Sequence, residues 1–436
     1  MVFGAVAVGG EGIKPVDIKG LFGTKVQAAK SDLTYDIYTY RVLTDNTVTI
    51  TGCDRSAQGA IKIPSQIDGK PVKSIGKDAF SKCGSLTRIN IPDSVTSIGD
   101  SAFDGCYKLT SINIPSSVTN IGCYAFMNTG IRNDESNWTE DGALYIGYAL
   151  VDSRYYQLPS SYQIKSGTRI IAGNVFSEYL TEIAIPDSVI FISDWAFSFC
   201  TGLTSITIPN SVTNIGDFAF SDCSSLTSVT IGNSVTNIGD SAFSNCSSLT
   251  SVTIGNNVTS IGDGAFSECG SLTNITIPDS VTSIGYCAFE FCNLTNLIIP
   301  KSVNYIGGGF ACCETLTSIS VESSNKYLLS ENGILFSKDK KTLLAYPPAK
   351  DGATYVLPNY VTTIGSYAFA KCRNLSSISL HNNVTIIGEG AFTLCTGLTC
   401  IKIPYGIKRI YERTFSRCNN LKSVVILSSV VAIDED

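Results

Sequence analysis

The sequence predicts a mainly β solenoid of 23-residue coils with short helical turns and two hairpin inserts. The first observation is repetition: residues 226–248 read LTSVTIGNSVTNIGDSAFSNCSS, residues 249–271 read LTSVTIGNNVTSIGDGAFSECGS, and they agree at 18 of 23 positions. The second is composition, because a chain that is 44% hydrophobic and 16% charged has the make-up of a folded protein. A fixed internal period indicates one stacked array and not several globular domains.

The repeat can be written L-x-x-I-x-I-P-x-S-V-T-x-I-G-x-x-A-F-x-x-C-x-x. Successive units begin 23 residues apart, or 22 in two cases, wherever no insert intervenes. Divergent units run through residues 162–176 and 355–372, and the total predicts about 14–15 coils. The units with a clear start begin at Leu86, Leu109, Leu180, Leu203, Leu226, Leu249, Leu272, Leu294, Leu316, Leu375, Leu398 and Leu421.

Each part of the unit has a local reading. LTSVTI is a short half-buried strand with Leu226, Val229 and Ile231 inward, and the Pro or Gly that follows turns the chain. SVTNIG is a second extended segment with Val235 and Ile238 inward. DSAFSNC is too short for a stable helix and predicts one helical turn. One coil cannot enclose a core, so stacked coils must bury each other's apolar columns.

The whole pattern, with I-P-x-S-V and A-F-x-x-C, resembles the BspA-like (treponemal-type) leucine-rich repeats over about residues 35–436. Residues 35–85 also resemble the lead-in of that family, down to IDGKPVKSIGKDAFSKC. The Asn of ordinary leucine-rich repeats is absent, so their asparagine ladder is not expected. The resemblance implies a non-enzymatic secreted or cell-surface protein, an adhesin for host matrix or neighbouring-cell proteins. The alternatives are a structural spacer that displays another module and, less favoured, a carbohydrate-binding or hydrolytic surface protein.

The predicted organisation has three parts. Residues 1–30 form a tail, in which VFGAVAVGG and Val26-Gln27-Ala28 suggest a secretion-signal remnant and a disordered chain end is the alternative. Residues 31–85 form an N-terminal cap and first repeat. Residues 86–436 form the solenoid, with inserts at about 130–170 and 322–357. The net charge of −6 argues against nucleic-acid or anionic-lipid partners, and no apolar run reaches the roughly 18 residues of a membrane span.

Cysteine forms a column. Equivalent residues in adjacent coils stack about 4.8 Å apart with parallel Cβ vectors, whereas a disulfide needs Cβ atoms about 3.8 Å apart and turned together. No C-x-x-C pair starts a zinc site. We therefore expect buried free thiols acting as small hydrophobes, with metal or redox roles as the alternatives. Of the 16 cysteines, 11 occupy the slot: Cys83, Cys106, Cys200, Cys223, Cys246, Cys269, Cys292, Cys313, Cys372, Cys395 and Cys418. Cys53, Cys123, Cys287, Cys312 and Cys400 are unassigned.

Aspartate forms a second column, at Asp100, Asp194, Asp217, Asp240 and Asp263. An Asp before a helical turn caps backbone N–H groups, while a row of carboxylates could hold Ca²⁺. Ser366, Glu389 and Glu412 take the same position in later coils, and a Ser would cap but bind Ca²⁺ poorly. Capping is therefore the favoured interpretation, and neither a metal nor a cofactor is expected.

Catalytic chemistry has little support. The single histidine, His381, stands at the position of the turn proline and is expected to be exposed. No nucleophile, zinc-protease or phosphate-loop motif is present, although paired glycosidase carboxylates leave no sequence signature. The strand positions that face outward are nearly all Thr, Ser or Asn, which predicts a solvated ribbon or a surface for weak multivalent contact. We expect no enzyme activity.

The inserts are the predicted address for a partner, because they break the repeat and hold aromatic anchors. Trp138, Tyr155 and Tyr156 are the predicted partner-binding residues; Tyr145, Phe336 and Tyr346 fit packing of the hairpins at least as well. A basic cluster follows, at Lys402, Lys408, Arg409, Arg413, Arg417 and Lys422, and it predicts a solvated face. The unit that starts at Leu421 lacks the A-F-x-x-C turn. We therefore expect that the natural chain continues beyond Asp436, or that this edge self-associates.

Overall fold

The computed structural model describes residues 32–434 except 309, 311 and 312. The predicted N-terminal tail and Cys312 lie outside the described residues. The chain divides into two compact units, an N-terminal unit up to Phe243 and a C-terminal unit from Ser244. Each unit is described by itself below.

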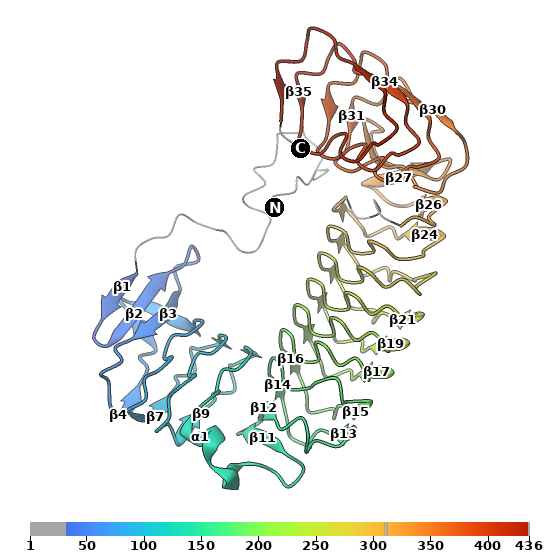
Figure 1. Cartoon of the computed structure of the whole chain (residues 1–436). Helices are drawn as coiled ribbons and strands as arrows, with labels where there is room; N and C mark the ends of the chain where they lie inside the picture. Colours follow the sequence, from blue (N-terminus) through green and yellow to red (C-terminus); the bar gives the residue numbers. More distant parts are fainter. Residues whose placement is uncertain (1–31, 309, 311–312, 435–436) are drawn as a thin grey trace. The chain divides into compact units, whose positions relative to one another are not determined.

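Over its described part, the chain forms a β-solenoid of about 17 turns of roughly 23 residues with almost no helix (Figure 1). This confirms the predicted fold class. The number of turns exceeds the expected 14–15 because the chain before the first clear repeat and the inserts contribute strands to the stack. Most regular coils supply a first strand of three to five residues, from L-x-x-I-x-I, and a second strand of two residues, from the segment that ends in I-G. The coil that begins at Leu272 has only the second strand.

An antiparallel meander begins the N-terminal unit. Its strands are β1 (Leu33–Tyr35), β2 (Tyr38–Val42) and β3 (Val48–Cys53), and β3 pairs in parallel with β6 (Lys70–Ile75). The short strand β5 (Gln66–Ile67) pairs antiparallel with β6. Tyr38 and Tyr40 are buried, and the ring of Tyr38 meets that of Phe80 edge-on at 6.2 Å. The meander thus covers the apolar start of the stack.

Parallel pairing one coil apart builds the rest of this unit. Ile206 pairs with Val229 among the first strands, and Ile215 pairs with Ile238 among the second strands. The first strands are β4 (Gly59–Lys62), β7 (Leu86–Asn90), β9 (Ser111–Asn113), β13 (Ser161–Gln163), β15 (Glu182–Ala184), β17 (Ser205–Ile208) and β19 (Ser228–Ile231). The second strands are β8 (Ser97–Ile98), β10 (Asn120–Ile121), β14 (Ile170–Ile171), β16 (Phe191–Ile192), β18 (Asn214–Ile215) and β20 (Asn237–Ile238).

Stacked phenylalanines form the centre of the core. The rings of Phe197, Phe220 and Phe243 are fully buried, nearly parallel and 4.8 and 5.1 Å apart. The repeat places the same ring at the same point of every coil, so each ring packs on its own copies.

The A-F segment differs from the expected helical turn. In the coil of Phe103 it consists of two tight turns, closed by the bonds from Ala102 N–H to Gly99 O and from Cys106 N–H to Phe103 O. The third residue of each turn, Ser101 and Gly105 here, adopts a positive φ. Two successive left-handed residues of this kind redirect the chain too sharply for a helix to continue.

The slot cysteines are buried and free. Their thiols also make hydrogen bonds: Cys106 Sγ donates to Phe80 O at 3.1 Å, and Cys223 Sγ donates to Phe197 O at 3.2 Å. Burial raises the pKa of the Cys106 thiol to about 12. The slot therefore favours a small apolar side chain that can also satisfy a buried carbonyl of the preceding coil.

The aspartate column links coils to one another. Asp194 Oδ1 accepts the backbone N–H of Asp217 at 2.9 Å, and Asp217 Oδ1 accepts that of Asp240 at 2.8 Å. The carboxylate therefore caps the following coil and not its own turn, because the stack brings that N–H closer. Within the described residues, no group of three or more His, Cys, Asp or Glu side chains could hold a metal ion.

The first insert contains α1 (Gly130–Asn133), the 3₁₀ turn Glu135–Asn137, and a hairpin of β11 (Ala143–Ile146) and β12 (Ala149–Ser153). The hairpin is part of the stack, since β12 pairs in parallel with β14. On the second-strand side, Gly173 N–H donates to Ile121 O at 2.9 Å, so coils before and after the insert meet. On the first-strand side, β9 and β13 belong to different sheets. β10 and β14 also belong to different sheets, so the insert interrupts strand pairing on both sides, and the Gly173–Ile121 bond bridges the second-strand side.

The C-terminal unit repeats the same plan. Its second insert is an antiparallel meander of β27 (Leu328–Glu331), β28 (Ile334–Ser337) and β29 (Thr342–Ala345), and β29 pairs in parallel with β31. Phe336 and Tyr346 are buried and pack the insert into the core. The other first strands are β21 (Ser251–Thr253), β24 (Asn296–Ile299), β26 (Ser318–Val321), β30 (Thr354–Val356), β32 (Ser377–Ser379), β34 (Cys400–Lys402) and β36 (Ser423–Val425). The second strands are β22 (Ser260–Ile261), β23 (Ser283–Ile284), β25 (Tyr305–Ile306), β31 (Thr363–Ile364), β33 (Ile386–Ile387), β35 (Arg409–Ile410) and β37 (Ala432–Ile433).

His381 is half-buried, and the expectation that it is exposed is wrong. Its Nε2 lies 2.9 Å from Pro358 O in the preceding coil, and its Nδ1 accepts the N–H of Asn383 at 3.3 Å. Both ring nitrogens lie within hydrogen-bond distance of backbone groups, because the turn after the first strand packs against the same turn of the preceding coil.

No helix among the described residues has the length and apolar character that crossing a membrane requires.

We predict that Asp217→Ala lowers the free energy of unfolding by about 1 kcal/mol, because the Asp240 N–H loses its acceptor. Asp217→Asn is the matched control, since its amide oxygen can still accept that N–H. Urea unfolding at neutral pH measures both variants. Equal loss of stability in the two variants would contradict the inter-coil role of the carboxylate.

A comparison of wild type with Asp217→Asn tests how the charge of the Asp217 carboxylate affects stability. The pKa of the Asp217 carboxyl group is raised, mainly by its partial burial and also by the nearby Asp194 and Asp240 carboxylates. The bond from the Asp240 N–H acts in the opposite direction and lowers this pKa. A raised folded-state pKa means that the folded protein holds the proton more tightly. The contribution to stability is therefore present at low pH and lost as the pH rises through that pKa. Unfolding at about pH 3 and pH 7 should show the Asn variant gaining stability relative to wild type as pH rises.

We also predict that the eleven slot cysteines react as free thiols once the chain is denatured without reductant. Parallel stacking gives their Cβ atoms the wrong separation and direction for disulfides. Iodoacetamide labelling followed by mass spectrometry counts the free thiols, and a reduced sample, which should take up 16 labels, is the control. Bridges between several slot cysteines would overturn the stacking geometry.

Candidate functional site

Two outward positions in each coil, here called the turn positions, are the third residues of the two tight turns. In most coils they hold small or polar residues such as Ser101, Asn128, Asn174 and Ser241, all at positive φ. Four turn positions of the N-terminal unit hold aromatic residues at positive φ instead: Tyr124 (56°), Trp195 (62°), Phe199 (61°) and Phe218 (56°). In the C-terminal unit Phe291 (57°) and Tyr367 (55°) do so.

Aromatic residues are poor choices for this backbone conformation. The left-handed region costs a residue with a side chain roughly 1–2 kcal/mol, and Gly or Asn would lower that cost. Burial does not offset it here, because Tyr124, Trp195 and Phe199 keep 53%, 37% and 56% of their surface exposed. Strained, exposed and bulky side chains at positions where other coils use small ones indicate a functional surface.

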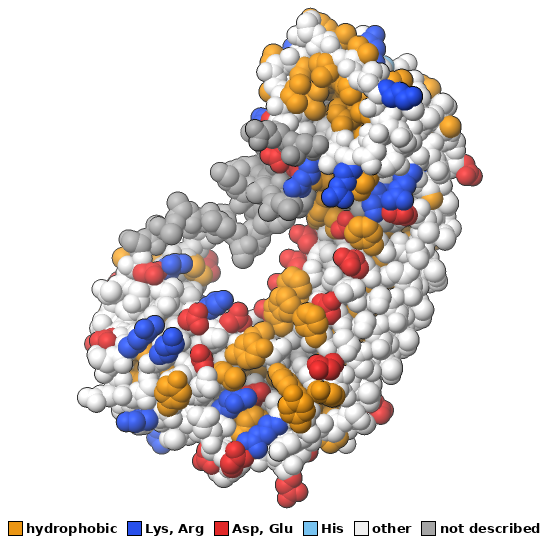
Figure 2. Space-filling model, viewed as in Figure 1, with side chains coloured by type: hydrophobic (Ala, Val, Ile, Leu, Met, Phe, Trp, Pro, Cys, Tyr) orange, Lys and Arg blue, Asp and Glu red, His pale blue; other side chains and the backbone are white. Residues whose placement is uncertain are grey.

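These side chains belong to a larger set on the N-terminal unit, which we call the aromatic face. The rings of Trp195 and Phe218 stack at 4.1 Å with 8° between their planes. Tyr156, which is 90% exposed, lies with its ring 5.8 Å from that of Tyr179. Figure 2 shows hydrophobic side chains gathered over the part of the unit that carries β12, β14 and β16. The aromatic face consists of Tyr124, Tyr155, Tyr156, Tyr179, Trp195, Phe199 and Phe218.

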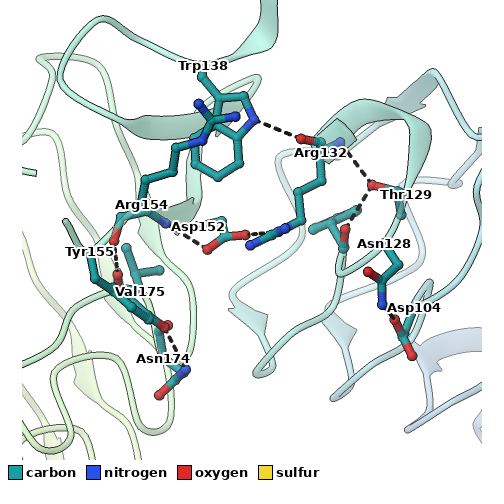
Figure 3. Close-up of polar contacts among 12 residues, drawn as sticks. Asp104, Asn128, Thr129, Arg132, Trp138, Asp152, Arg154, Tyr155, Asn174 and Val175 are labelled. Atoms are coloured by element: carbon teal, nitrogen blue, oxygen red, sulfur yellow. Dashed lines mark hydrogen bonds and ion pairs between the residues drawn. The ribbon is translucent and has the colours of Figure 1, made fainter. Parts of the chain in front are cut away.

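The structure places Trp138 inside the first insert (Figure 3). Its indole N–H donates to Arg132 O at 2.8 Å, and its ring lies between the guanidinium groups of Arg132 (5.6 Å) and Arg154 (4.4 Å). Both arginines also form ion pairs, with Asp152 at 2.5 Å and Glu135 at 2.7 Å respectively. Trp138 is half-buried, and its polar group already has a partner.

Tyr155 and Tyr156 leave the insert to meet the following coil. The Tyr155 hydroxyl donates to Asn174 O at 3.3 Å and accepts from the Asn174 side-chain amide at 3.1 Å, so the ring is fixed (Figure 3). Burial raises the pKa of Tyr155 to about 12. Asn174 N–H in turn donates to Trp195 O at 3.1 Å, which joins Tyr155 to the column of turn positions. The two tyrosines thus belong to the aromatic face, while Trp138 packs within the insert.

The surroundings of the aromatic face are acidic. Between Arg169 and Lys301 the sequence has no Lys or Arg and eleven Asp or Glu. Two of these, Asp194 and Asp217, directly precede Trp195 and Phe218, so carboxylates and rings alternate along neighbouring coils. The nearby Arg132 and Arg154 are already engaged by carboxylates of the insert. The face therefore combines exposed rings with negative charge.

Sequence reasoning missed five members of this face: Tyr124, Tyr179, Trp195, Phe199 and Phe218. A signal was present, because the aligned coils read Ser, Tyr, Asn, Trp, Phe, Ser and Gly in order at the first turn position from residue 101 to residue 264. The sequence did not reveal the positive φ at that position, or the contact of the insert tyrosines with the same coils.

The other candidate surfaces have structural partners. In the ribbon of first strands, Thr227 Oγ1 donates to Thr204 O at 2.9 Å, so its hydroxyl ties one coil to the previous one. In the C-terminal unit, Arg409 pairs with Asp434 at 2.7 Å, which neutralises part of the basic cluster. Lys371 is buried, with its Nζ 3.9 Å from the ring centroid of Phe291 and 2.9 Å from Glu314 Oε1.

The chain is similar to several bacterial leucine-rich repeat proteins of known structure. A leucine-rich repeat protein from Eubacterium ventriosum is 28% identical, with a TM-score of 0.47, over 53% of this chain and 72% of that one. One from Bacteroides ovatus is 28% identical, with a TM-score of 0.43, over 92% and 90%. A leucine-rich cell surface protein from Faecalibacterium prausnitzii is 25% identical, with a TM-score of 0.39, over 94% and 95%. No curated protein matches the chain.

The model of the BspA type leucine rich repeat region matches six copies, over residues 59–137, 155–269, 236–333 and 352–436. These ranges cover most of the chain and include the coils that carry the aromatic face. The chain belongs to the BspA-type leucine-rich repeat family.

Proposed function

We propose that this chain is a secreted or cell-surface protein that binds other proteins, an adhesin for host or neighbouring-cell protein, and that the aromatic face is its contact surface. The observation that carries the proposal is the set of exposed aromatic side chains at strained turn positions. Trp and Tyr are the side chains that most often dominate protein–protein binding energy. They offer a large contact area with few rotatable bonds, so little conformational entropy is lost when they bind.

Within this proposal the predicted residues have different roles. Tyr156 contacts the partner directly, because it is the most exposed ring of the set. Tyr155 is half-buried, and its two hydrogen bonds to Asn174 hold its ring in place within the face. Trp138 holds Arg132 and Arg154 in place and so positions the segment that leads into the two tyrosines.

A non-enzymatic role fits the same observations. The aromatic face presents rings that suit a binding surface. Its carboxylates accept backbone N–H groups of neighbouring coils. His381 lies in the C-terminal unit with both nitrogens against backbone groups, and no nucleophile contacts it in the described structure.

The second candidate is a structural spacer, which the uniform coils from Leu203 to Gly270 favour. A spacer needs stable stacking but no strained aromatic residues on its surface. It predicts that this chain alone has no protein ligand, whereas an adhesin predicts measurable affinity.

We predict that the chain binds a protein in a screen of immobilised matrix and cell-surface proteins, and that the triple variant Tyr156→Ala, Trp195→Ala, Phe218→Ala weakens this binding by about 2 kcal/mol or more, roughly 30-fold. Tyr156 and Trp195 are exposed and Phe218 is half-buried, so thermal unfolding should change little. Surface plasmon resonance measures the affinity. Tyr107→Ala is the matched control, because Tyr107 is an exposed tyrosine of the same unit outside the face. Unchanged affinity of the triple variant would exclude the aromatic face as the contact surface.

Self-association is a further part of the proposal. Val431 and Ile433, beside and in β37, are exposed apolar side chains, and among the described residues β37 pairs with β35 alone. We expect a concentration-dependent rise in sedimentation coefficient that Val431→Asp with Ile433→Asp abolishes. A wild-type chain that sediments as a monomer at high concentration would contradict it.

A further inference from the structure

We propose that the aromatic face binds an extended protein segment rich in Lys and Arg, whose cationic groups lie over the exposed rings and against the carboxylates of Asp194 and Asp217. This inference rests on the proposed function, since it names the chemistry of the partner for the same surface.

Elsewhere in the molecule, Lys and Arg side chains lie over aromatic rings. Arg154 lies over Trp138 at 4.4 Å, Arg169 over Tyr148 at 5.2 Å, and Lys371 over Phe291 at 3.9 Å. In these three places a Lys or Arg covers a nearby ring, as the electrostatics of aromatic side chains favour.

The rings of the aromatic face differ from these rings, because no cation of the described chain covers them. Among the residues that the structure describes, no Lys or Arg lies over any of its seven rings, and the sequence between Arg169 and Lys301, which holds four of the rings, has no Lys or Arg. The chain therefore presents the acceptor half of a cation–π surface without supplying the cations. A partner that brings them completes the arrangement.

The carboxylates beside the rings complement a positively charged partner. Asp194 and Asp217 are one coil apart, and each is directly followed by a ring of the stacked pair Trp195 and Phe218. The proximity of these carboxylates contributes to the raised pKa of Asp217, which shows mutual repulsion. A cation relieves this repulsion and compensates for the water that both groups lose on binding. A neutral glycan would stack on the rings but leave the carboxylates uncompensated.

An extended peptide matches the shape of the face. The rings are arranged along successive coils, which are about 4.8 Å apart, and an extended chain advances about 3.3 Å per residue. Side chains on one side of such a segment therefore recur at intervals of one to two coils. Several cationic side chains can then reach rings of the same face at once.

The test uses the full chain and fluorescein-labelled peptides of the sequence KSKSKSKS, QSQSQSQS and ESESESES, with anisotropy as the readout. We expect the Lys peptide to bind, and to bind more weakly in 300 mM than in 50 mM NaCl because salt screens the charges. The Gln and Glu peptides should not bind. Chitohexaose, added as a competitor, should not displace the Lys peptide.

Two sets of variants locate the binding. Asp194→Asn with Asp217→Asn keeps the oxygens that accept the backbone N–H groups of Asp217 and Asp240, although it gives up the bond from Asn120 Nδ2 to Asp194 Oδ2. The double change should weaken Lys-peptide binding about fivefold or more. Trp195→Ala should weaken it by a similar factor, about fivefold, and Phe218→Leu gives a second test of the rings if the Ala variant unfolds. Asp187→Asn, an exposed acid of the same unit outside the face, is the control and should have no effect.

The outcomes separate the two proposals. If the partner from the screen loses affinity in the aromatic variants but is indifferent to salt and to the Asn pair, the cationic chemistry is overturned and the proposed contact surface stands. Preferential binding of chitohexaose by the wild-type face would overturn the inference in favour of a glycan. If neither the aromatic nor the Asn variants change binding of that partner or of the Lys peptide, both proposals fail.

Discussion

A coil of about 23 residues has too few apolar side chains to enclose a core, so every buried group must be covered by its copy in the next coil. The rest of the structure depends on this constraint. Phe197 stacks on Phe220, the Cys223 thiol donates to Phe197 O in the coil before, and Asp194 accepts the N–H of Asp217 in the coil after. The same register that stacks the rings therefore also satisfies the polar groups, and one repeated set of residues serves both purposes.

The constraint also fixes the surface. Tight turns must return the chain to the same register, and each turn puts one residue at positive φ and outward. Such positions are costly for bulky residues and contribute little to the core, so they are the places where side chains can change without disturbing the stack. The aromatic residues at Trp195, Phe199 and Phe218 occupy these positions, and their neighbours Asp194 and Asp217 meet the inter-coil bond requirement while adding negative charge.

The inserts connect the stack to this surface. The first one interrupts strand pairing on both sides, and a backbone bond between Gly173 and Ile121 bridges the second-strand side. Arginines on both sides of Trp138 and their carboxylate partners hold the insert in a defined shape. The chain then leaves it at Tyr155, whose hydroxyl is bound by Asn174, and at Tyr156, which meets Tyr179. A break in the repeat thus brings two tyrosines to coils that supply five further rings.

The repeat by itself determined the solenoid, the strand pair of each coil and the buried columns, because identical side chains at a fixed period can be buried only against their own copies. It also indicated Tyr155 and Tyr156, since an aromatic-rich break in such a repeat is visible without coordinates. Tertiary structure decided the rest. The helical turn became two tight turns, and His381 became half-buried, because contacts between coils outweigh local preference. Trp138 packs against its arginines, and the exposed Trp195 stacks on the half-buried Phe218. The physical reason is that side-chain direction at a turn depends on φ and on the neighbouring coil, and a one-dimensional period contains neither.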